Sequence, residues 1–305
     1  MFGLWFISAG FFLRSQSAPV SPDVNNNLNF QFLERDATTN FVVAVVPIEG
    51  IITEEGRGPE NMANTVKEML RSARENPNVK AVILEVQSPG GTVNASDLIW
   101  NEVVKVKKSG KPVVAFFNGL AASGGYYVST PADKIVATPE TMTGSIGVIM
   151  QSPDFSELMG KVGVKFNTIK SGPQKDILSP YKPMDEEAQK ILQGMVDRSY
   201  GRFVKKVAEG RKLDEKVVRK IADGRIYDAE EAFNNGLIDE LGYIESAFIV
   251  AKGLAKIEQA SLVRCNRRVN IFGGLFSKVN LDPLASVKQQ MPLGRPGMYY
   301  LWIGD

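Results

Sequence analysis

Short apolar runs alternate with amphipathic stretches from residue 41 to residue 255. Strands are predicted at 41–48, 80–86, 111–117, 134–139, 145–150 and 164–169, where the runs are short and mostly rich in β-branched residues. Helices are predicted at 60–75, 94–108, 154–161, 185–209, 213–222, 228–235 and 243–255. Most of the strand runs are uniformly apolar, as is typical of parallel strands covered on both faces. The pattern therefore indicates an α/β fold with mainly parallel sheets and flanking helices.

The longest predicted helix, 185–209, has an apolar stripe along one side. The stripe consists of Ala188, Ile191, Leu192, Met195, Val196, Phe203, Val204 and Val207. Packing against the core is the first interpretation of this stripe. A surface for a partner helix or a second subunit is the alternative.

The N-terminal segment differs from the rest in composition. Residues 1–13 are apolar and uncharged up to Arg14. This run is shorter than the roughly 20 residues that cross a bilayer, and it lacks the basic start of a signal peptide. Three interpretations stay open: a truncated or mis-started membrane anchor, the core of a signal peptide, or a hydrophobic segment docked on the domain.

The composition also suggests where the domain begins and ends. We expect a hydrophobic anchor at 1–14, a tether rich in Ser, Pro and Asn at 15–40, and a folded domain at 41–255. Residues 256–305 contain several Pro and Gly and two apolar runs, 271–276 and 298–302. They are predicted to form a loosely packed C-terminal extension that covers a subunit surface or lies near the membrane.

Two residue counts exclude whole classes of chemistry. The 305-residue chain has no histidine and a single cysteine, Cys265. A Ser-His-Asp triad, a Cys-His pair, a disulfide framework and the common zinc sites are therefore excluded. The net charge is +2, and no stretch combines clustered basic and aromatic residues, so nucleic acid is not an expected partner.

Glycine-containing turns follow two of the predicted buried strands. One is Ser88-Pro89-Gly90-Gly91, and the other contains Ser123 followed by Gly124. In a parallel sheet, sites form where strands end and the next helices begin. Ser123 has two interpretations: a helix N-cap, or a nucleophile beside free helix N–H groups that suit a developing oxyanion.

A nucleophilic serine needs a base, and lysine is the available substitute for histidine. The ordinary lysine pKa of about 10.4 would have to fall by roughly three units, which is about 4 kcal/mol, and burial can supply a shift of that size. Lys170, Lys175 and Lys182 all lie in the loop at 170–183. Composition does not choose among them.

Five motifs in order resemble one known family. They are SPGG (88–91), ASGGYY (122–127), TMTGSIGVIM (141–150), IKSGPQKDILSP (169–180) and DGRIYDAEEAFNNGLIDELG (223–242). Together they resemble the bacterial signal peptide peptidase family, serine proteases with a Ser–Lys dyad on the ClpP/crotonase fold. The resemblance covers roughly residues 41–255.

The resemblance implies a role for each matching residue. Ser123 is the expected nucleophile, Lys175 the general base, and Ser145 the serine that orients the lysine amine. Gly90 or Gly91, together with the Gly124 N–H, is the expected oxyanion hole, with a preference for Gly91.

Other residues that match the family's motifs are expected to have structural roles, and the resemblance points to catalysis by protein groups alone. Arg225, Tyr227 and Asp239 of the last motif are interpreted as structural, and Lys170 as a surface or structural residue. The resemblance implies no metal and no organic cofactor.

The resemblance also implies an assembly and a location. Relatives of this length form homo-oligomeric rings in which neighbouring subunits share each active site. The implied location is the cytoplasmic membrane, with the catalytic domain on the extracytoplasmic side. The implied substrates are cleaved signal peptides and other unfolded apolar peptides.

Three alternatives remain beside this interpretation. The first is a crotonase-type acyl-CoA enzyme, which normally relies on carboxylates and has no need of Ser123 with Lys175. The second is a non-catalytic ring that acts as a membrane scaffold. The third is a protease of the same fold with another role, in membrane-protein quality control or phage maturation.

Overall fold

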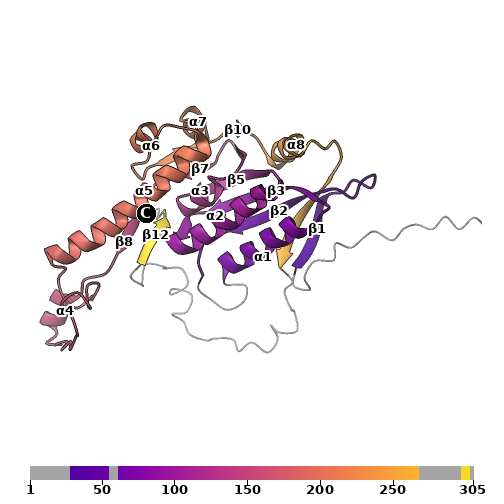
Figure 1. Ribbon diagram of the computed structural model, residues 1–305. Coiled ribbons are helices and arrows are strands. Elements are labelled where there is room, and N and C mark those ends of the chain that lie inside the picture. Colours follow the sequence, from indigo (N-terminus) through magenta and orange to yellow (C-terminus); the bar gives the residue numbers. More distant parts are fainter. Residues whose placement is uncertain (1–27, 55–60, 268–296, 303–305) are drawn as a thin grey trace, which may run out of the picture.

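The computed structural model describes residues 28–54, 61–267 and 297–302 (Figure 1). The hydrophobic run at 1–13 and the apolar run at 271–276 lie outside the described residues. Within the described part, the chain forms a nine-stranded sheet, a three-stranded sheet and flanking helices.

The large sheet is mainly parallel, which confirms the predicted α/β fold. Its main path runs β1-β11-β2-β3-β5-β6-β10, and β7 and β9 attach at the end of β5. β2, β3, β5, β6, β7, β10 and β11 pair in parallel, whereas β1 and β9 pair antiparallel with their neighbours. The strands are β1 (Leu28–Glu34), β2 (Val42–Glu49), β3 (Val79–Ser88), β5 (Val113–Ala122), β6 (Lys134–Ala137), β7 (Met142–Gly144), β9 (Ile226–Asp228), β10 (Glu240–Leu241) and β11 (Ser261–Arg267).

Helices cover both faces of this sheet, and the strand sequences show why. In β2, Ala44 and Val46 belong to the core beneath α1 (Met62–Glu75) and α2 (Val93–Lys108). Val43 and Val45 belong to the core beneath α8 (Ile244–Ala255). Because alternate residues point to opposite faces, both sets must be apolar. The remaining helices are α3 (Gly124–Ser129), α4 (Ser156–Lys161), α5 (Glu186–Arg211), α6 (Glu215–Ile221) and α7 (Ala229–Asn234).

Two predicted strands are wrong. Over 145–150 the chain instead turns at Ser145, with φ 48°, before the short strand β8 (Ile149–Gln151). Residues 164–169 form no strand, and Val164, Phe166 and Ile169 are exposed. An apolar run becomes a strand when a neighbouring strand takes its hydrogen bonds, and 164–169 has no such neighbour among the described residues.

The expected tether and C-terminal extension both contain strands of the sheets. β1 lies within the expected tether at 15–40 and pairs with β11, which lies beyond residue 255. β11 in turn pairs in parallel with β2. β12 (Gly297–Leu301) lies between β4 (Gly90–Thr92) and β8 in the three-stranded sheet. The domain boundaries inferred from composition did not include these strands, because their pairing partners are far away along the chain.

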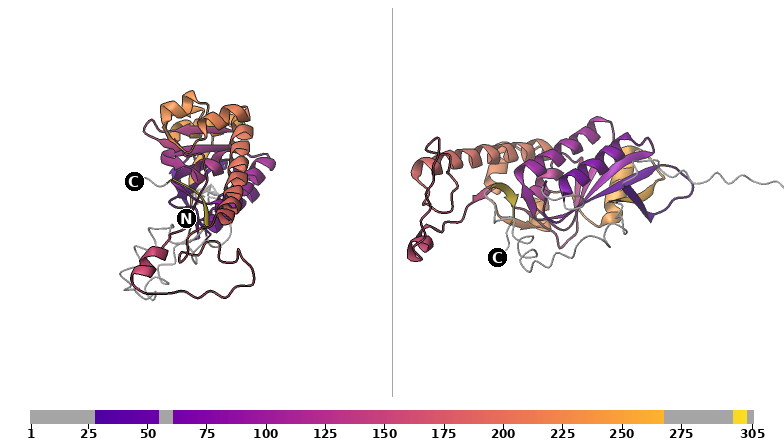
Figure 2. Two further views of the ribbon diagram at one scale, coloured as in Figure 1. Left: turned by 90° about the vertical axis from the view of Figure 1, so that its left-hand side faces the viewer. Right: turned by 90° about the horizontal axis from the view of Figure 1, so that it is seen from below.

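Residues 152–184 form an arm that extends away from the sheet (Figures 1 and 2). The arm contains α4 and leads into α5, whose C-terminal half is buried against the core through Phe203, Val204 and Val207. In the N-terminal half of α5, Ile191 and Met195 are exposed. The apolar stripe of α5 thus has a core-facing part and a part open to solvent. None of the helices in the described residues is long and apolar enough to cross a membrane.

Two glycines of α5 should respond oppositely to substitution. A Cβ on Gly210 would lie 1.9 Å from the Thr130 carbonyl oxygen, whereas a Cβ on Gly201 would have nothing within 4 Å. Gly201→Ala should stabilise the protein by about 0.5–1 kcal/mol, the usual gain in a helix. Gly210→Ala should destabilise it by about 1–3 kcal/mol, because the backbone must move. Urea unfolding of both variants checks the pair, and a gain from Gly210→Ala would contradict the packing of α5 on α3.

Candidate active site

Ser123 lies at a sharp turn between β5 and α3. Its backbone has φ 51° and ψ −110°, a conformation that costs a non-glycine residue about 1–3 kcal/mol. Its N–H donates to the Gly144 carbonyl at 2.8 Å, and its carbonyl accepts from the Tyr127 N–H at 2.8 Å. The hydroxyl makes no capping hydrogen bond, so the N-cap interpretation is wrong. The side chain is 1% exposed.

The start of α3 lies against β4 because both segments lack side chains at the contact. A Cβ on Gly124 would lie 3.0 Å from the Gly90 Cα and 3.0 Å from the Gly91 nitrogen. A Cβ on Gly125 would lie 2.9 Å from the Ser88 carbonyl oxygen. Glycine at these positions lets the first turn of α3, where N–H groups lack helical partners, approach the turn after β3.

The two candidate glycines of β4 have different backbone environments. The Gly90 N–H donates to the Ser88 Oγ at 3.1 Å. The bridge to Ile52 uses the Gly90 carbonyl and the Thr92 N–H, at 2.8 and 2.9 Å. Because neighbouring N–H groups of a strand point to opposite edges, the Gly91 N–H faces away from Ile52. This geometry favours Gly91 over Gly90 as the donor beside Gly124.

Ser145 follows β7 directly, just as Ser123 follows β5. Ala122 and Gly144 are paired residues in the parallel β5–β7 ladder, so the two serines leave the sheet side by side. Ser145 is buried, has φ 48°, and donates its N–H to the Arg225 carbonyl at 2.7 Å.

The motif at 223–242 supports this arrangement. It contains β9, which pairs antiparallel with β7. The Tyr227 ring lies against Gly144, where a Cβ would be 2.7 Å from the Tyr227 Cδ2, and its hydroxyl donates to the Ile221 carbonyl at 2.8 Å. Asp239 accepts from the Ile135 N–H at 2.9 Å and pairs with Arg211 at 2.8 Å. The β9 pairing and the Tyr227 contact support the turn that carries Ser145, whereas Asp239 links β6 to α5.

Lys175 is the expected site residue that does not join this cluster. It is exposed in the arm, and within the described chain no hydrogen bond or ion pair involves its amine. Lys170 and Lys182 both bind the Asp176 carboxylate at 2.8 Å, and their hydrogen bonds lower the Asp176 pKa to about 2. Lys170 and Lys182 therefore stabilise the turn around Asp176, whereas the Lys175 amine makes no such contact within the arm.

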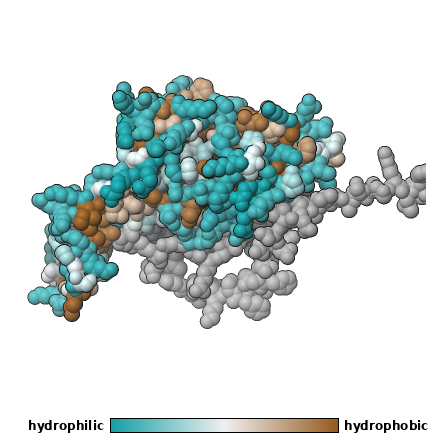
Figure 3. Space-filling model, in the orientation of Figure 1, coloured by the Kyte–Doolittle hydropathy of each residue, from teal (hydrophilic) through white to brown (hydrophobic). Residues whose placement is uncertain are grey.

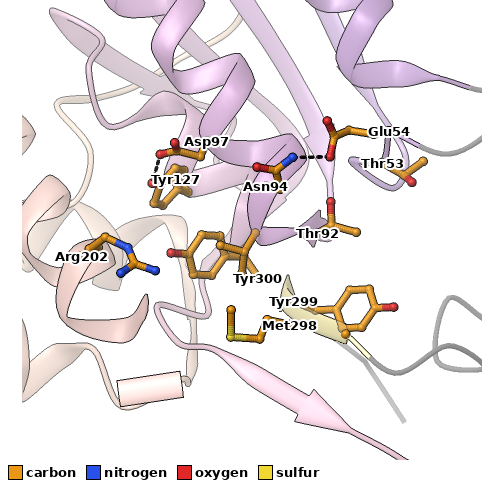
Figure 4. Close-up of a pocket in the computed structure, with 12 residues that line it drawn as sticks. Thr53, Glu54, Thr92, Asn94, Asp97, Tyr127, Arg202, Met298, Tyr299 and Tyr300 are labelled. Atoms are coloured by element: carbon orange, nitrogen blue, oxygen red, sulfur yellow. Dashed lines mark hydrogen bonds between the residues drawn. The ribbon is translucent and has the colours of Figure 1, made fainter. Parts of the chain in front are cut away.

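A pocket of about 590 Å³ opens beside this cluster, and the sequence patterns did not predict it (Figure 4). Tyr127, one turn after Ser123, donates to Asp97 at 2.6 Å, and the Lys206 amine donates to the same carboxylate at 2.6 Å. Burial raises the Asp97 pKa, but these two hydrogen bonds together with the positive charges of Lys206 and Arg202 outweigh it, and the pKa falls. Arg202 lines the same pocket. Tyr127 lies in a recognisable motif, whereas Asp97 and Arg202 had no signal in the sequence.

The described part of the chain contains no evident set of metal ligands. No group of three or more His, Cys, Asp or Glu side chains there could hold a metal ion.

A serine held at a strained strand-to-helix turn, beside converging backbone N–H groups, is typical of serine hydrolases. Comparison with known proteins specifies the class. Residues 105–258 match Peptidase family S49, and residues 42–158 match the N-terminal domain of NfeD1b. The chain belongs to Peptidase family S49 and is a serine peptidase.

The relatives extend this similarity over most of the chain. A putative signal peptide peptidase SppA from Enterococcus faecium is 41% identical over 78% of this chain and 71% of its own length. Protease 4 from Salmonella typhi is 40% identical over 74% of this chain, but the match spans 37% of that protein. A ClpP1 mutant from Listeria monocytogenes matches with a TM-score of 0.45 and 19% identity, over 67% of this chain and 93% of that one.

The strained backbone of Ser123 predicts an unusual order of stability. Ser123→Gly should be about 1 kcal/mol more stable than Ser123→Ala, because glycine tolerates positive φ. At Ser129, a helical position in α3, the order should reverse, with the glycine variant about 1 kcal/mol less stable than alanine. Thermal unfolding of the four variants measures this. Equal stability of the two Ser123 variants would show that the turn is not strained.

Proposed function

We propose that this protein is an endopeptidase that uses Ser123 as the nucleophile and Lys175 as the general base. The observation that carries the proposal is the position of Ser123, which is held at positive φ between Gly144 and Gly124 with its hydroxyl free of a capping role. Gly91 and Gly124 supply the oxyanion donors, and Ser145 orients the lysine amine. Membership of a peptidase family favours this function over an acyl-CoA enzyme.

We assign Lys175 to the active site of a second copy of the chain. The arm that carries Lys175 extends away from the body of the fold, as Figure 1 and the right-hand view of Figure 2 show. Ser123 is buried in the body of the same chain, and Lys175 is exposed. If the arm reaches a neighbouring subunit, Lys175 lies beside Ser123 of that subunit. The Ser123 of the first subunit is then served by the arm of another copy.

The surface of the arm supports contact with a second copy. Apolar side chains are exposed along it (Figure 3). They are Phe155, Leu158, Val162, Val164, Phe166, Ile169, Tyr181 and Met184, and they continue to Ile191 and Met195 on α5. Exposed apolar patches of this kind mark protein contacts. Repeating the same arm-to-neighbour contact around an axis forms a closed ring, which is the assembly we propose.

The chemistry proceeds through an acyl-enzyme. The neutral Lys175 amine takes the proton from the Ser123 hydroxyl as its oxygen attacks the peptide carbonyl. The Gly91 and Gly124 N–H groups stabilise the tetrahedral oxyanion. The protonated lysine then gives its proton to the leaving amine, and a water molecule repeats the sequence to release the acyl group and restore Ser123.

The name of a relative suggests the substrates, and the composition of the N-terminal segment suggests the location. The Enterococcus faecium relative is named as a signal peptide peptidase, and we propose cleaved signal peptides and other unfolded apolar peptides as substrates here. We also propose that residues 1–14 anchor the protein at the cytoplasmic membrane, with the catalytic domain on the extracytoplasmic side. This segment is apolar and precedes the first described strand.

Complementation between two inactive variants tests the shared site. Ser123→Ala and Lys175→Ala should each lose at least about 100-fold in kcat/KM on a fluorogenic apolar peptide, the usual loss of an essential base or nucleophile. Lys175→Arg should be equally inactive, because a guanidinium stays protonated. Mixing Ser123→Ala with Lys175→Ala under conditions of subunit exchange should restore part of the activity.

A neighbouring lysine provides the matched control. Lys165 is exposed in the same arm, and Lys165→Ala should keep full activity. Full activity in Lys175→Ala would rule out the dyad. If mixing restores nothing although fluorescence energy transfer confirms subunit exchange, the base belongs to the same chain as the nucleophile.

A further inference from the structure

The loop at 170–182, which carries Lys175, has little regular secondary structure to hold it. No helix or strand lies between α4 and α5 in the described chain, so the loop lacks a continuous ladder of backbone hydrogen bonds. Three turn hydrogen bonds join its backbone, from the N–H groups of Lys175, Ile177 and Ser179 to the carbonyls of Gly172, Gln174 and Asp176, at 3.2, 3.2 and 2.9 Å. Because a lysine amine is carried on a flexible four-carbon stem, the place that it reaches depends on how firmly its backbone is held.

The Asp176 carboxylate ties the two ends of this loop together. Its Oδ1 accepts from the Lys170 amine and from the Lys182 amine, at 2.8 Å each. Lys170 also donates to the Pro173 carbonyl at 2.8 Å. The two lysines lie six positions on either side of Asp176, so a single carboxylate closes the loop that contains Lys175.

This carboxylate is shielded from solvent and stays charged. The Asp176 side chain is 14% exposed. Hydrogen bonds from Lys170 and Lys182 lower the Asp176 pKa to about 2, so the carboxylate is ionised at neutral pH. Charge-assisted hydrogen bonds of this kind are shorter and stronger than those between neutral groups. The carboxylate network therefore adds a firm side-chain connection to a loop with few backbone bonds.

Other contacts of the arm fix the chain at the end of the loop and beside it. The Phe155 N–H donates to the Pro180 carbonyl at 2.7 Å. The Phe166 ring stacks on the Tyr181 ring, with 3.7 Å between the ring centroids. These contacts lie beyond the turn that contains the proposed base. The position of that turn is thus left largely to the carboxylate network.

We propose that Asp176 is a positioning residue, which acts through Lys170 and Lys182 to hold the loop that presents Lys175 to Ser123 of a neighbouring copy. The proposal rests on the peptidase function proposed above and adds a residue to its site. It also gives Lys170, interpreted from the sequence as a surface or structural residue, a defined role. Misplacing a catalytic group by about 1 Å can cost about 100-fold in rate, so a loosened loop should slow the reaction.

Asp176→Asn in the full chain tests the role of the charge, because it keeps the size of the side chain. We expect kcat on a fluorogenic apolar peptide to fall by about 10-fold and KM to stay within about 2-fold, since a misplaced base slows the chemistry without changing substrate binding. Asp154→Asn is the matched control. It removes the same charge from the same arm, where Asp154 accepts from the Ser156 N–H at 2.9 Å, and it should keep full activity.

Mixed assemblies separate positioning from a general structural effect. In them, Lys175→Ala subunits supply Ser123, and Ser123→Ala subunits supply Lys175. Asp176→Asn on the Ser123→Ala chain should lower the restored activity by about 10-fold, whereas the same substitution on the Lys175→Ala chain should change it by less than about 2-fold. An equal loss from both placements would show that Asp176 serves folding or assembly, and the positioning role would be wrong.

Amide exchange measures the hold on the loop without relying on catalysis. Hydrogen–deuterium exchange, read by mass spectrometry, should be at least about 3-fold faster at 170–182 in Asp176→Asn than in the unsubstituted chain. Asp154→Asn should leave exchange in this loop unchanged. Full kcat in folded Asp176→Asn, or unchanged exchange at 170–182, would overturn the proposal.

A second variant covers the case in which Asp176→Asn does not fold, as judged by circular dichroism and thermal unfolding. Lys170→Met combined with Lys182→Met removes both donors and should give the same loss of kcat and the same faster exchange. If this variant also unfolds, the network is structural and the proposal is wrong.

Failure of the peptidase function gives a different result. If the unsubstituted chain cleaves no peptide, the peptidase function is rejected, while faster exchange in Asp176→Asn still supports the hold of Asp176 on the loop. If the unsubstituted chain cleaves peptides and Asp176→Asn cleaves them equally well, the peptidase function stands and the positioning role is rejected.

Discussion

The close approach of α3 to β4 is the contact on which the candidate site depends. Gly124 and Gly90 can approach each other because neither has a Cβ: one on Gly90 would lie 2.6 Å from the Gly124 nitrogen, and one on Gly124 would lie 3.0 Å from the Gly90 Cα. The approach brings the start of α3 next to β4, which is where the proposed oxyanion donors, Gly91 and Gly124, lie. A larger side chain at either glycine would separate the two elements and with them the donors.

The sheet supplies the second half of this arrangement. β5 and β7 pair in parallel and end at neighbouring residues, so Ser123 and Ser145 leave the sheet together. Both serines have positive φ, a backbone conformation that the surroundings must enforce. Hydrogen bonds to the Gly144 and Arg225 carbonyls do this. The strain in these two turns therefore lowers the free energy of unfolding of the protein.

The proposed base, Lys175, lies outside the cluster that contains Ser123 and Ser145. Lys175 is carried on an arm whose apolar side chains are exposed, and Asp176 holds the neighbouring Lys170 and Lys182 in the turn. The same arm thus carries both the proposed base and a surface suited to another copy. Association would then both bury the apolar surface and complete the site.

The sequence by itself determined the α/β class, most of the strands and helices, and the glycine-containing turns at 88–91 and at Ser123, whereas the turn at Ser145 was predicted as a strand. These features depend on local apolar periodicity and on glycines beside strand ends, which are visible along the chain. The tertiary structure alone decided that β1, β11 and β12 complete the sheets, that 164–169 forms no strand, and that Tyr300 fills a pocket with Ser199. Each of these depends on pairing or packing between residues far apart in sequence, and local patterns carry no signal for such partners.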